Sequence, residues 1–190
     1  MKISYTDSFQ RTQQPEVCCT QNFLDAGCLE YINHLKDTEK WTDAFVGGAI
    51  IRPTIRVTKN IMIEEDNDSH YLYKSLERAF KTINDKSFHY HISSIHDVSI
   101  LKYEAGCFYK PHLDIGGWQS DRKISLIVQL SNPDSYTGCD IILHCSPATK
   151  IDKTFNAGTF FPSYLLHEAT QLLTGTRYAL VTWATGEPFR

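Results

Sequence analysis

Apolar residues recur at helical spacing in two stretches of the first half of the chain. From Asn22 to Lys36, apolar positions three or four residues apart predict an amphipathic helix. The second stretch follows an acidic turn at 64–69, where Ser69 is placed to cap a second helix. The predicted buried faces consist of Leu24, Cys28, Ile32 and Leu35 in the first helix, and Leu72, Leu76, Ala79, Phe80 and Ile83 in the second.

Two other segments of this half do not follow a helical pattern. The first 20 or so residues are polar and include Gln13-Gln14-Pro15, so we expect a loose lead-in. Residues 50–63 are rich in β-branched side chains, and Pro53 among them fits an edge strand or a bend.

After Lys86 the pattern changes to short apolar stretches separated by turn residues. Turns recur every 8–12 residues or so, a rhythm typical of an all-β sandwich or barrel. We therefore expect a helical N-terminal layer over residues 1–86 that covers a β-core of about eight strands over 87–190, in a single domain spanning 1–190. The predicted strand regions are 95–103, 108–113, 122–131, 138–145, 158–162, 164–168 and 177–184.

The composition limits the classes of binding partner and the cellular compartment that we expect for this protein. The 190 residues are 42% hydrophobic and 22% charged, and 19 basic against 22 acidic residues give a net charge of −3. This balance argues against a general nucleic-acid-binding surface, and no apolar run is long enough for a membrane span. The six cysteines form no Cys-x-x-Cys pair and no secretory signal is visible, so we expect reduced thiols and a cytoplasmic protein.

The most informative chemistry lies in the segment Tyr109-Lys-Pro-His-Leu-Asp114. His112 and Asp114 are two residues apart, so in an extended strand their side chains project from the same face. An imidazole beside a carboxylate supplies two of the three ligands of a 2-His-1-carboxylate Fe(II) site. Alone this pair is a weak signal, since a solvent-exposed strand pair has the same spacing. Downstream, however, His167 follows a long β-rich interval, and Arg177 opens the next apolar strand.

Several landmarks in this order resemble the Fe(II)- and 2-oxoglutarate-dependent dioxygenases, specifically their prolyl 4-hydroxylase-like branch. The similarity runs from about Ile95 to Trp183. The landmarks are Tyr103–Gly106, Tyr109–Asp114, Arg122–Ser131, Tyr136–Gly138, His167 and Thr176–Tyr178. The resemblance implies a double-stranded β-helix (jelly-roll) core, and it implies that His112, Asp114 and His167 bind the iron.

The resemblance also implies roles for residues around the metal. Arg177 would pair with the distal carboxylate of 2-oxoglutarate through its planar guanidinium, and Tyr103 would hydrogen-bond the same cosubstrate. Strand alternation and spacing predict a pocket wall and floor next to these two residues. The residues predicted to form that wall and floor are Ser125, Ile127, Gln129 and Trp183.

The sequence does not decide the role of three further features. The loop 114–121 is either a lid that folds over the substrate or a plain hairpin connection, and Tyr109 and Trp118 are candidate substrate contacts. Gly138-Cys139 stands where the family often has Gly-Gly, a change expected to affect only a bend. Gln129 stands where some relatives place a hydroxyl toward the cosubstrate.

The activity implied by the resemblance is hydroxylation of an unactivated C–H bond with Fe(II), 2-oxoglutarate and O₂, with ascorbate as a candidate reductant. The favoured substrate is a prolyl residue of a protein or peptide. A free amino acid or other small molecule is the alternative within the same chemistry, because no appended peptide-binding or oligomerisation domain is evident. The alternative of another class is a non-catalytic, metal-binding β-barrel that acts as a sensor or interaction module.

Overall fold

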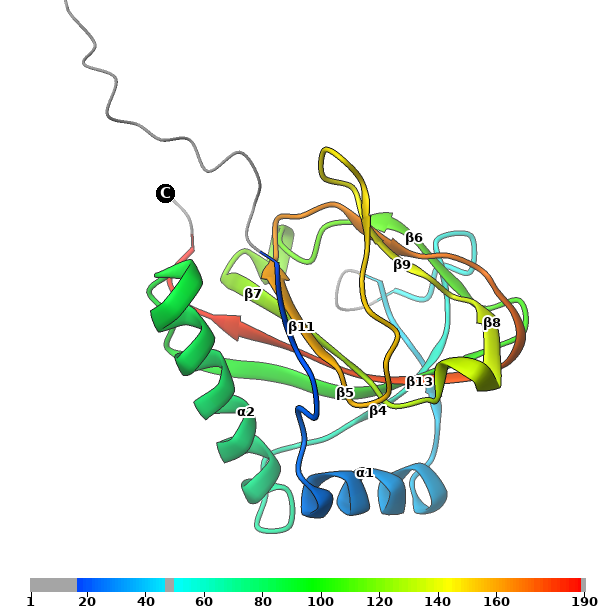
Figure 1. Cartoon of the computed structure of the whole chain (residues 1–190), viewed down its shortest axis with the longest axis horizontal. Helices are drawn as coiled ribbons and strands as arrows, with labels where there is room; N and C mark the ends of the chain where they lie inside the picture. Colours follow the sequence, from blue (N-terminus) through cyan, green and yellow to red (C-terminus); the bar gives the residue numbers. More distant parts are fainter. Residues whose placement is uncertain (1–16, 47–49, 189–190) are drawn as a thin grey trace, which may run out of the picture.

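The computed structural model describes residues 17–46 and 50–188 of the chain. Two long helices and two antiparallel sheets dominate the fold (Figure 1). The helices are α1 (Ala26–Thr38) and α2 (His70–Ile83), and a short π-helix, Asn84–Phe88, extends α2. The strands are β1 (Cys18–Thr20), β2 (Thr42–Asp43), β3 (Arg56–Val57), β4 (Lys59–Met62), β5 (Ser94–Glu104), β6 (Phe108–His112), β7 (Arg122–Gln129), β8 (Tyr136–Gly138), β9 (Ile141–Leu143), β10 (Thr149–Lys150), β11 (Gly158–Pro162), β12 (His167–Ala169) and β13 (Leu172–Thr185).

The strands form two layers. The larger sheet has eight strands in the order β1-β11-β7-β13-β5-β4-β2, with β8 paired to one end of β13. The smaller sheet has five strands in the order β10-β9-β12-β6-β3. This two-layered, mainly antiparallel architecture is the predicted jelly roll. No helix in the described part of the chain is long and apolar enough to cross a membrane.

Strand alternation explains why the large sheet is buried on both faces. In β7, Ile124, Leu126 and Val128 belong to the core shared with the helices, whereas Ile127 belongs to the core between the sheets. Figure 1 shows α1 and α2 on the outer side of this sheet, with β6 and β9 on its opposite side. The predicted helical faces point into the outer core, and Leu76 and Phe80 are fully buried there.

Three local expectations need correction. Residues 18–20 are not part of a loose lead-in, because they form β1 and pair with β11, whereas residues 1–16 lie outside the described range. Ser69 precedes α2, but its side chain does not cap that helix. Its hydroxyl instead donates to the Glu64 carbonyl and accepts from the Asp66 amide, which closes the preceding turn. The helical layer also contains the short strands β2–β4.

In the segment 50–63, the structure agrees with the bend, and not with the edge strand, as the place of Pro53. Pro53 lies in a turn, β3 joins the small sheet through β6, and β4 joins the large sheet through β5. Only Thr58 separates the two strands, so this segment bridges the layers. Its side chains are thereby placed at the opening between the two sheets.

Asn156 connects the start of the helical layer to the β-core, and its removal should destabilise the fold. The residue is buried, and its amide donates to the Leu24 carbonyl (2.8 Å) and accepts from the Leu24 amide (2.9 Å). Asn156→Ala would leave both backbone groups without a partner. We expect the free energy of unfolding, measured by urea denaturation, to fall by about 2–4 kcal/mol. Asn33→Ala on the exposed face of α1 is the matched control, and equal stability of the two variants would contradict the prediction.

Candidate metal centre and active-site cavity

The pairing of β6 with β12 brings three separate side chains together. His112 is the last residue of β6, His167 is the first residue of β12, and the antiparallel register places them directly opposite one another. Asp114 follows two residues after His112. The potential ligand atoms of these three residues all lie within 4.8 Å of one another, and no other group of His, Cys, Asp or Glu in the described ranges has such geometry.

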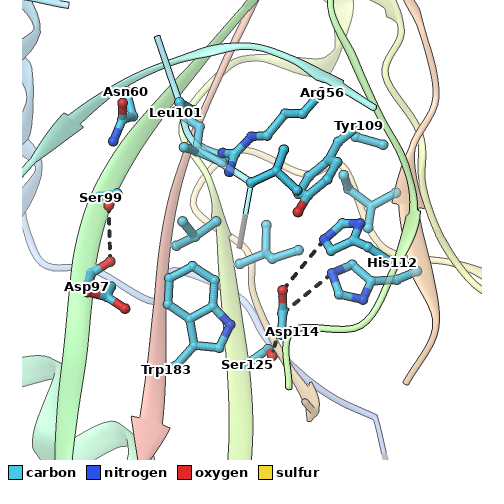
Figure 2. A pocket seen from close by; sticks show the side chains of 18 of the residues that line it. Arg56, Asn60, Asp97, Ser99, Leu101, Tyr109, His112, Asp114, Ser125 and Trp183 are labelled. Atoms are coloured by element: carbon cyan, nitrogen blue, oxygen red, sulfur yellow. Dashed lines mark hydrogen bonds and ion pairs between the residues drawn. The ribbon is translucent and has the colours of Figure 1, made fainter. Parts of the chain in front are cut away.

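Backbone hydrogen bonds orient both imidazoles. Nδ1 of His112 contacts the Lys110 carbonyl and Nδ1 of His167 contacts the Leu165 carbonyl, each at 2.8 Å. A carbonyl only accepts, so both Nδ1 atoms carry a proton, and the Nε2 atoms are the nitrogens that can bind a metal. The Nε2 atoms of His112 and His167 lie 3.6 and 3.5 Å from the two carboxylate oxygens of Asp114 (Figure 2).

The Asp114 carboxylate is buried and held in its ionised form. Burial alone would raise its pKa, but His167, His112 and a hydrogen bond from the Ser125 hydroxyl (2.7 Å) outweigh burial and lower the pKa. The Ser125 hydroxyl lies 3.0 Å from the Ser163 hydroxyl, so a buried pair of serines supports the carboxylate. Arg122 fixes the backbone of Asp114 by donating to its carbonyl.

The surroundings of His167 favour neutral imidazole. This side chain is buried, and burial lowers its pKa more than the attraction of Asp114 raises it. Two imidazole nitrogens and one carboxylate oxygen, each supported by a second hydrogen bond, form the donor set that non-haem Fe(II) sites use. These residues therefore fit Fe(II) in both ligand type and arrangement.

The cluster opens into a cavity of about 530 Å³ between the two sheets. Figure 2 shows Asp114, Tyr109, Trp183 and Arg56 around the same space. The sequence-predicted residues that line it are His112, Asp114, His167, Arg177, Tyr103, Tyr109, Ser125, Ile127 and Trp183.

Arg177 is a buried cation, only 1% exposed, in the cavity wall. Its Nε and Nη2 donate to the side-chain carbonyl of Gln129 at 3.2 and 2.9 Å, and its Nη1 lies 3.8 Å from the thiol of Cys139. Within residues 17–46 and 50–188 it forms no ion pair with a carboxylate. A buried guanidinium without a counter-charge is suited to an anionic ligand.

Two aromatic residues with polar groups, Tyr103 and Trp183, also line the cavity. Burial raises the pKa of Tyr103 to about 12, so its hydroxyl stays protonated and can donate a hydrogen bond. The guanidinium carbon of Arg177 lies 5.4 Å from the Tyr103 ring centre. Trp183 packs under Arg122, and its buried indole Nε1 has no hydrogen-bond partner in the part of the chain that the structure describes.

Two predicted contacts lie outside the cavity lining. Gln129 shares the inner face of β7 but reaches the cavity only indirectly, because its carbonyl is used by Arg177. Trp118 is 95% exposed at the tip of the loop after Asp114, in a short 3₁₀ turn, Gly117–Gln119. That loop instead contributes Ile115, Gly116 and Gln119 to the lining.

Sequence reasoning missed three residues of the site. Arg56 reaches the cavity from a two-residue strand that carries no motif, and Arg122 could be read only as the start of a strand. Cys139 does more than change a bend, because its buried thiol contacts Arg177 and its backbone is left-handed (φ 48°). A non-glycine residue in that conformation is uncommon, which indicates that the surrounding structure enforces it.

Comparison with known proteins shows a similarity of this region to one enzyme family. Residues 98–185 match the family model described as the 2OG-Fe(II) oxygenase superfamily. A PKHD-type hydroxylase from Rippkaea orientalis is 29% identical over 140 residues, which cover 67% of this chain and 61% of that protein. A PKHD-type hydroxylase from Crocosphaera subtropica is 33% identical over 99 residues, covering 49% and 44%. The chain therefore spans less than two thirds of these curated relatives.

Solved structures share the fold at lower sequence identity. A prolyl hydroxylase from Trichoplax adhaerens, in complex with a hypoxia inducible factor oxygen degradation domain peptide fragment, superposes with a TM-score of 0.74 at 20% identity, over 89% of this chain and 83% of that one. A prolyl-4-hydroxylase from Pseudomonas putida gives a TM-score of 0.73 at 17% identity, over 91% and 94%. These similarities confirm the jelly-roll fold.

Gln129 should stabilise the buried guanidinium of Arg177. Gln129→Leu would remove the acceptor shared by Nε and Nη2, so we expect the free energy of unfolding to fall by about 1–3 kcal/mol in urea denaturation. Gln129→Glu keeps an acceptor at this position and should remain within about 1 kcal/mol of the wild type. If the leucine variant is as stable as the glutamate variant, Gln129 does not support Arg177.

Proposed function

Because residues 98–185 of this chain match the model of the 2OG-Fe(II) oxygenase superfamily, we propose that the protein is a member of that superfamily and an Fe(II)- and 2-oxoglutarate-dependent hydroxylase. The family implies Fe(II) as the metal cofactor, and 2-oxoglutarate and O₂ as cosubstrates. The observation that carries the proposal is a cluster of two oriented imidazoles and one carboxylate, in the same cavity as a buried arginine that forms no ion pair among the described residues.

In this proposal His112, Asp114 and His167 bind the metal through the two Nε2 atoms and the Asp114 carboxylate. When bound, Fe(II) supplies the activation of O₂ that couples decarboxylation of 2-oxoglutarate to hydroxylation of a C–H bond. The chain contributes fixed ligand directions, because each imidazole is held by a backbone carbonyl and the carboxylate is held by Ser125. Three protein ligands leave positions open for other molecules.

Arg177 binds the distal carboxylate of 2-oxoglutarate in this scheme. Gln129 occupies the edge of the guanidinium formed by Nε and Nη2, which directs the remaining donors toward the ligand. The protonated hydroxyl of Tyr103 is a second donor. Ser125, Ile127 and Trp183 line the space around the cosubstrate and exclude water from it.

We propose a prolyl residue in a protein or peptide as the substrate. The names of the PKHD-type relatives and the prolyl hydroxylases of similar fold support this choice. Tyr109 lines the cavity next to His112 and would contact the residue to be hydroxylated, whereas the exposed Trp118 would contact a peptide that extends beyond the cavity. A free amino acid is the alternative substrate, and the non-catalytic metal-binding module is the alternative function.

We also propose a domain organisation, a cellular compartment and a reductant for this protein. We treat residues 1–190 as one domain, because the helices and the large sheet share a core. All six cysteines are free thiols, which fits a reducing compartment such as the cytoplasm. Ascorbate is proposed as a reductant that keeps the metal ferrous.

Loss of a metal ligand should abolish turnover without unfolding the protein. We expect His112→Ala and Asp114→Ala to form less than about 1% of the succinate formed by the wild type, since each removes one of three ligands. Both should also bind Co(II) at least about tenfold more weakly, measured by its visible absorption. His34→Ala, on the exposed face of α1, is the control and should match the wild type. Full succinate production by either ligand variant would remove that residue from the site.

Removal of Arg177 should raise the concentration of 2-oxoglutarate that the enzyme needs. We expect Arg177→Ala to raise the KM for 2-oxoglutarate by about tenfold to hundredfold, because a charge-assisted bidentate contact is lost. Circular dichroism and thermal unfolding would show whether the variant is folded at the assay temperature. An unchanged KM in a folded variant would exclude Arg177 from the cosubstrate site.

A further inference from the structure

Arg56 reaches the active-site cavity from the edge of the small sheet. It lies on β3, directly opposite Tyr109 of β6. Its guanidinium carbon is 4.7 Å from the centre of the Tyr109 ring, and that ring stacks on the imidazole of His112 with 3.4 Å between ring centres. Figure 2 shows the Arg56 side chain directed into the cavity beside Tyr109 and Leu101. A single aromatic ring thus separates this cation from the proposed metal centre.

One edge of the Arg56 guanidinium is left without a partner. Nη1 donates to the Phe45 carbonyl at 3.0 Å, which fixes the direction of the group. Across the two described ranges, neither the buried Nε nor Nη2 has a hydrogen-bond partner. Nε and Nη2 form the side-on fork of an arginine, which matches the two oxygens of a carboxylate. In Arg177 the same edge is filled by Gln129.

The acidic residues of the cavity do not supply the missing partner. Asp97 is paired with Arg122 at 2.7 Å, and Glu168 contacts His144 at 3.0 Å. Asp114 faces the two imidazoles and Ser125. Among the described residues, Arg56 therefore forms no ion pair, although it lines the same cavity as these carboxylates.

The cosubstrate does not need this cation. In the proposed function one carboxylate of 2-oxoglutarate binds at the metal and the other binds Arg177, so both of its negative charges are already matched. Arg56 lies on the other side of Tyr109, at the opening where the segment 50–63 bridges the two sheets. An anionic group that fills this edge of Arg56 would therefore come with another molecule.

We propose that Arg56 binds a carboxylate of the substrate, so that the enzyme selects an amino acid or peptide with a carboxylate close to the hydroxylated carbon. This inference rests on the proposed function, because it takes the other reactants as given. The carboxylate has two possible sources: the α-carboxylate of a free amino acid, or the acidic side chain of a residue next to the target in a peptide. Both would use the same side-on fork.

Two matched pairs of probes separate these sources. The first pair is L-proline and L-prolinamide. The second pair is acetyl-Gly-Pro-Asp-Gly-amide and the same peptide with asparagine in place of aspartate. Binding is measured by calorimetry without oxygen, with Fe(II) and 2-oxoglutarate present, so that no turnover occurs. Hydroxylation is measured separately in air, as a mass increase of the probe.

We expect the wild type to bind the carboxylate member of one pair at least about tenfold more tightly, as a charge-assisted bidentate contact requires. Arg56→Gln should lose this preference, and Arg56→Lys should keep part of it because the charge remains without the planar fork. Arg52→Gln removes an exposed arginine outside the cavity lining and should keep the full preference. The pair that shows the preference identifies the source of the carboxylate.

The following results would contradict the proposed role of Arg56. Equal binding of both members in each pair, or no binding of either carboxylate probe, would exclude a carboxylate subsite. A raised requirement for 2-oxoglutarate in Arg56→Gln, with unchanged preference between probes, would assign Arg56 to the cosubstrate. If the wild type forms no succinate in air, the proposed hydroxylase activity fails. The calorimetric preference is read without turnover, so it still decides the role of Arg56.

Discussion

The chemistry of this protein depends on the register between two short strands. β6 and β12 are far apart in sequence, and their antiparallel pairing places His112 opposite His167. A shift of one residue would turn either imidazole to the other face of the small sheet. The backbone carbonyls that orient the two Nδ1 atoms lie two residues before each histidine, in β6 for His112 and in the turn before β12 for His167, so the local backbone also orients each imidazole.

The second constraint on the site is that charged arginine side chains lie in a largely buried cavity. Arg177 and Arg56 reach the cavity without carboxylate partners among the described residues, whereas Arg122 has one in Asp97. Neutral acceptors orient both unpaired cations: the side chain of Gln129 holds Arg177, and the carbonyl of Phe45 holds Arg56. Each guanidinium is thus fixed in direction but not neutralised, which leaves its charge available to a ligand.

Sequence patterns predicted the elements with strong periodicity and the three candidate metal ligands, which stand in a recognisable order along the chain. The two helices, the strand rhythm after Lys86 and the clustering of His112, Asp114 and His167 agree with the structure. The patterns could not predict Arg56, because a two-residue strand has no periodicity and its partner β6 is distant in sequence. They also missed the contact between Cys139 and Arg177, because it depends on packing between strands.

A long strand and a short strand carry the two unpaired arginines of the cavity. Arg177 and Trp183 lie on β13, a 14-residue strand hydrogen-bonded to β5 and β7, so that wall is held on both sides. Arg56 lies on a two-residue strand at the outer edge of the small sheet. Edge positions tolerate substitution better than paired central strands. The rim of this cavity can therefore accept new side chains, by natural variation or by design, while the long strand that carries Arg177 keeps its position.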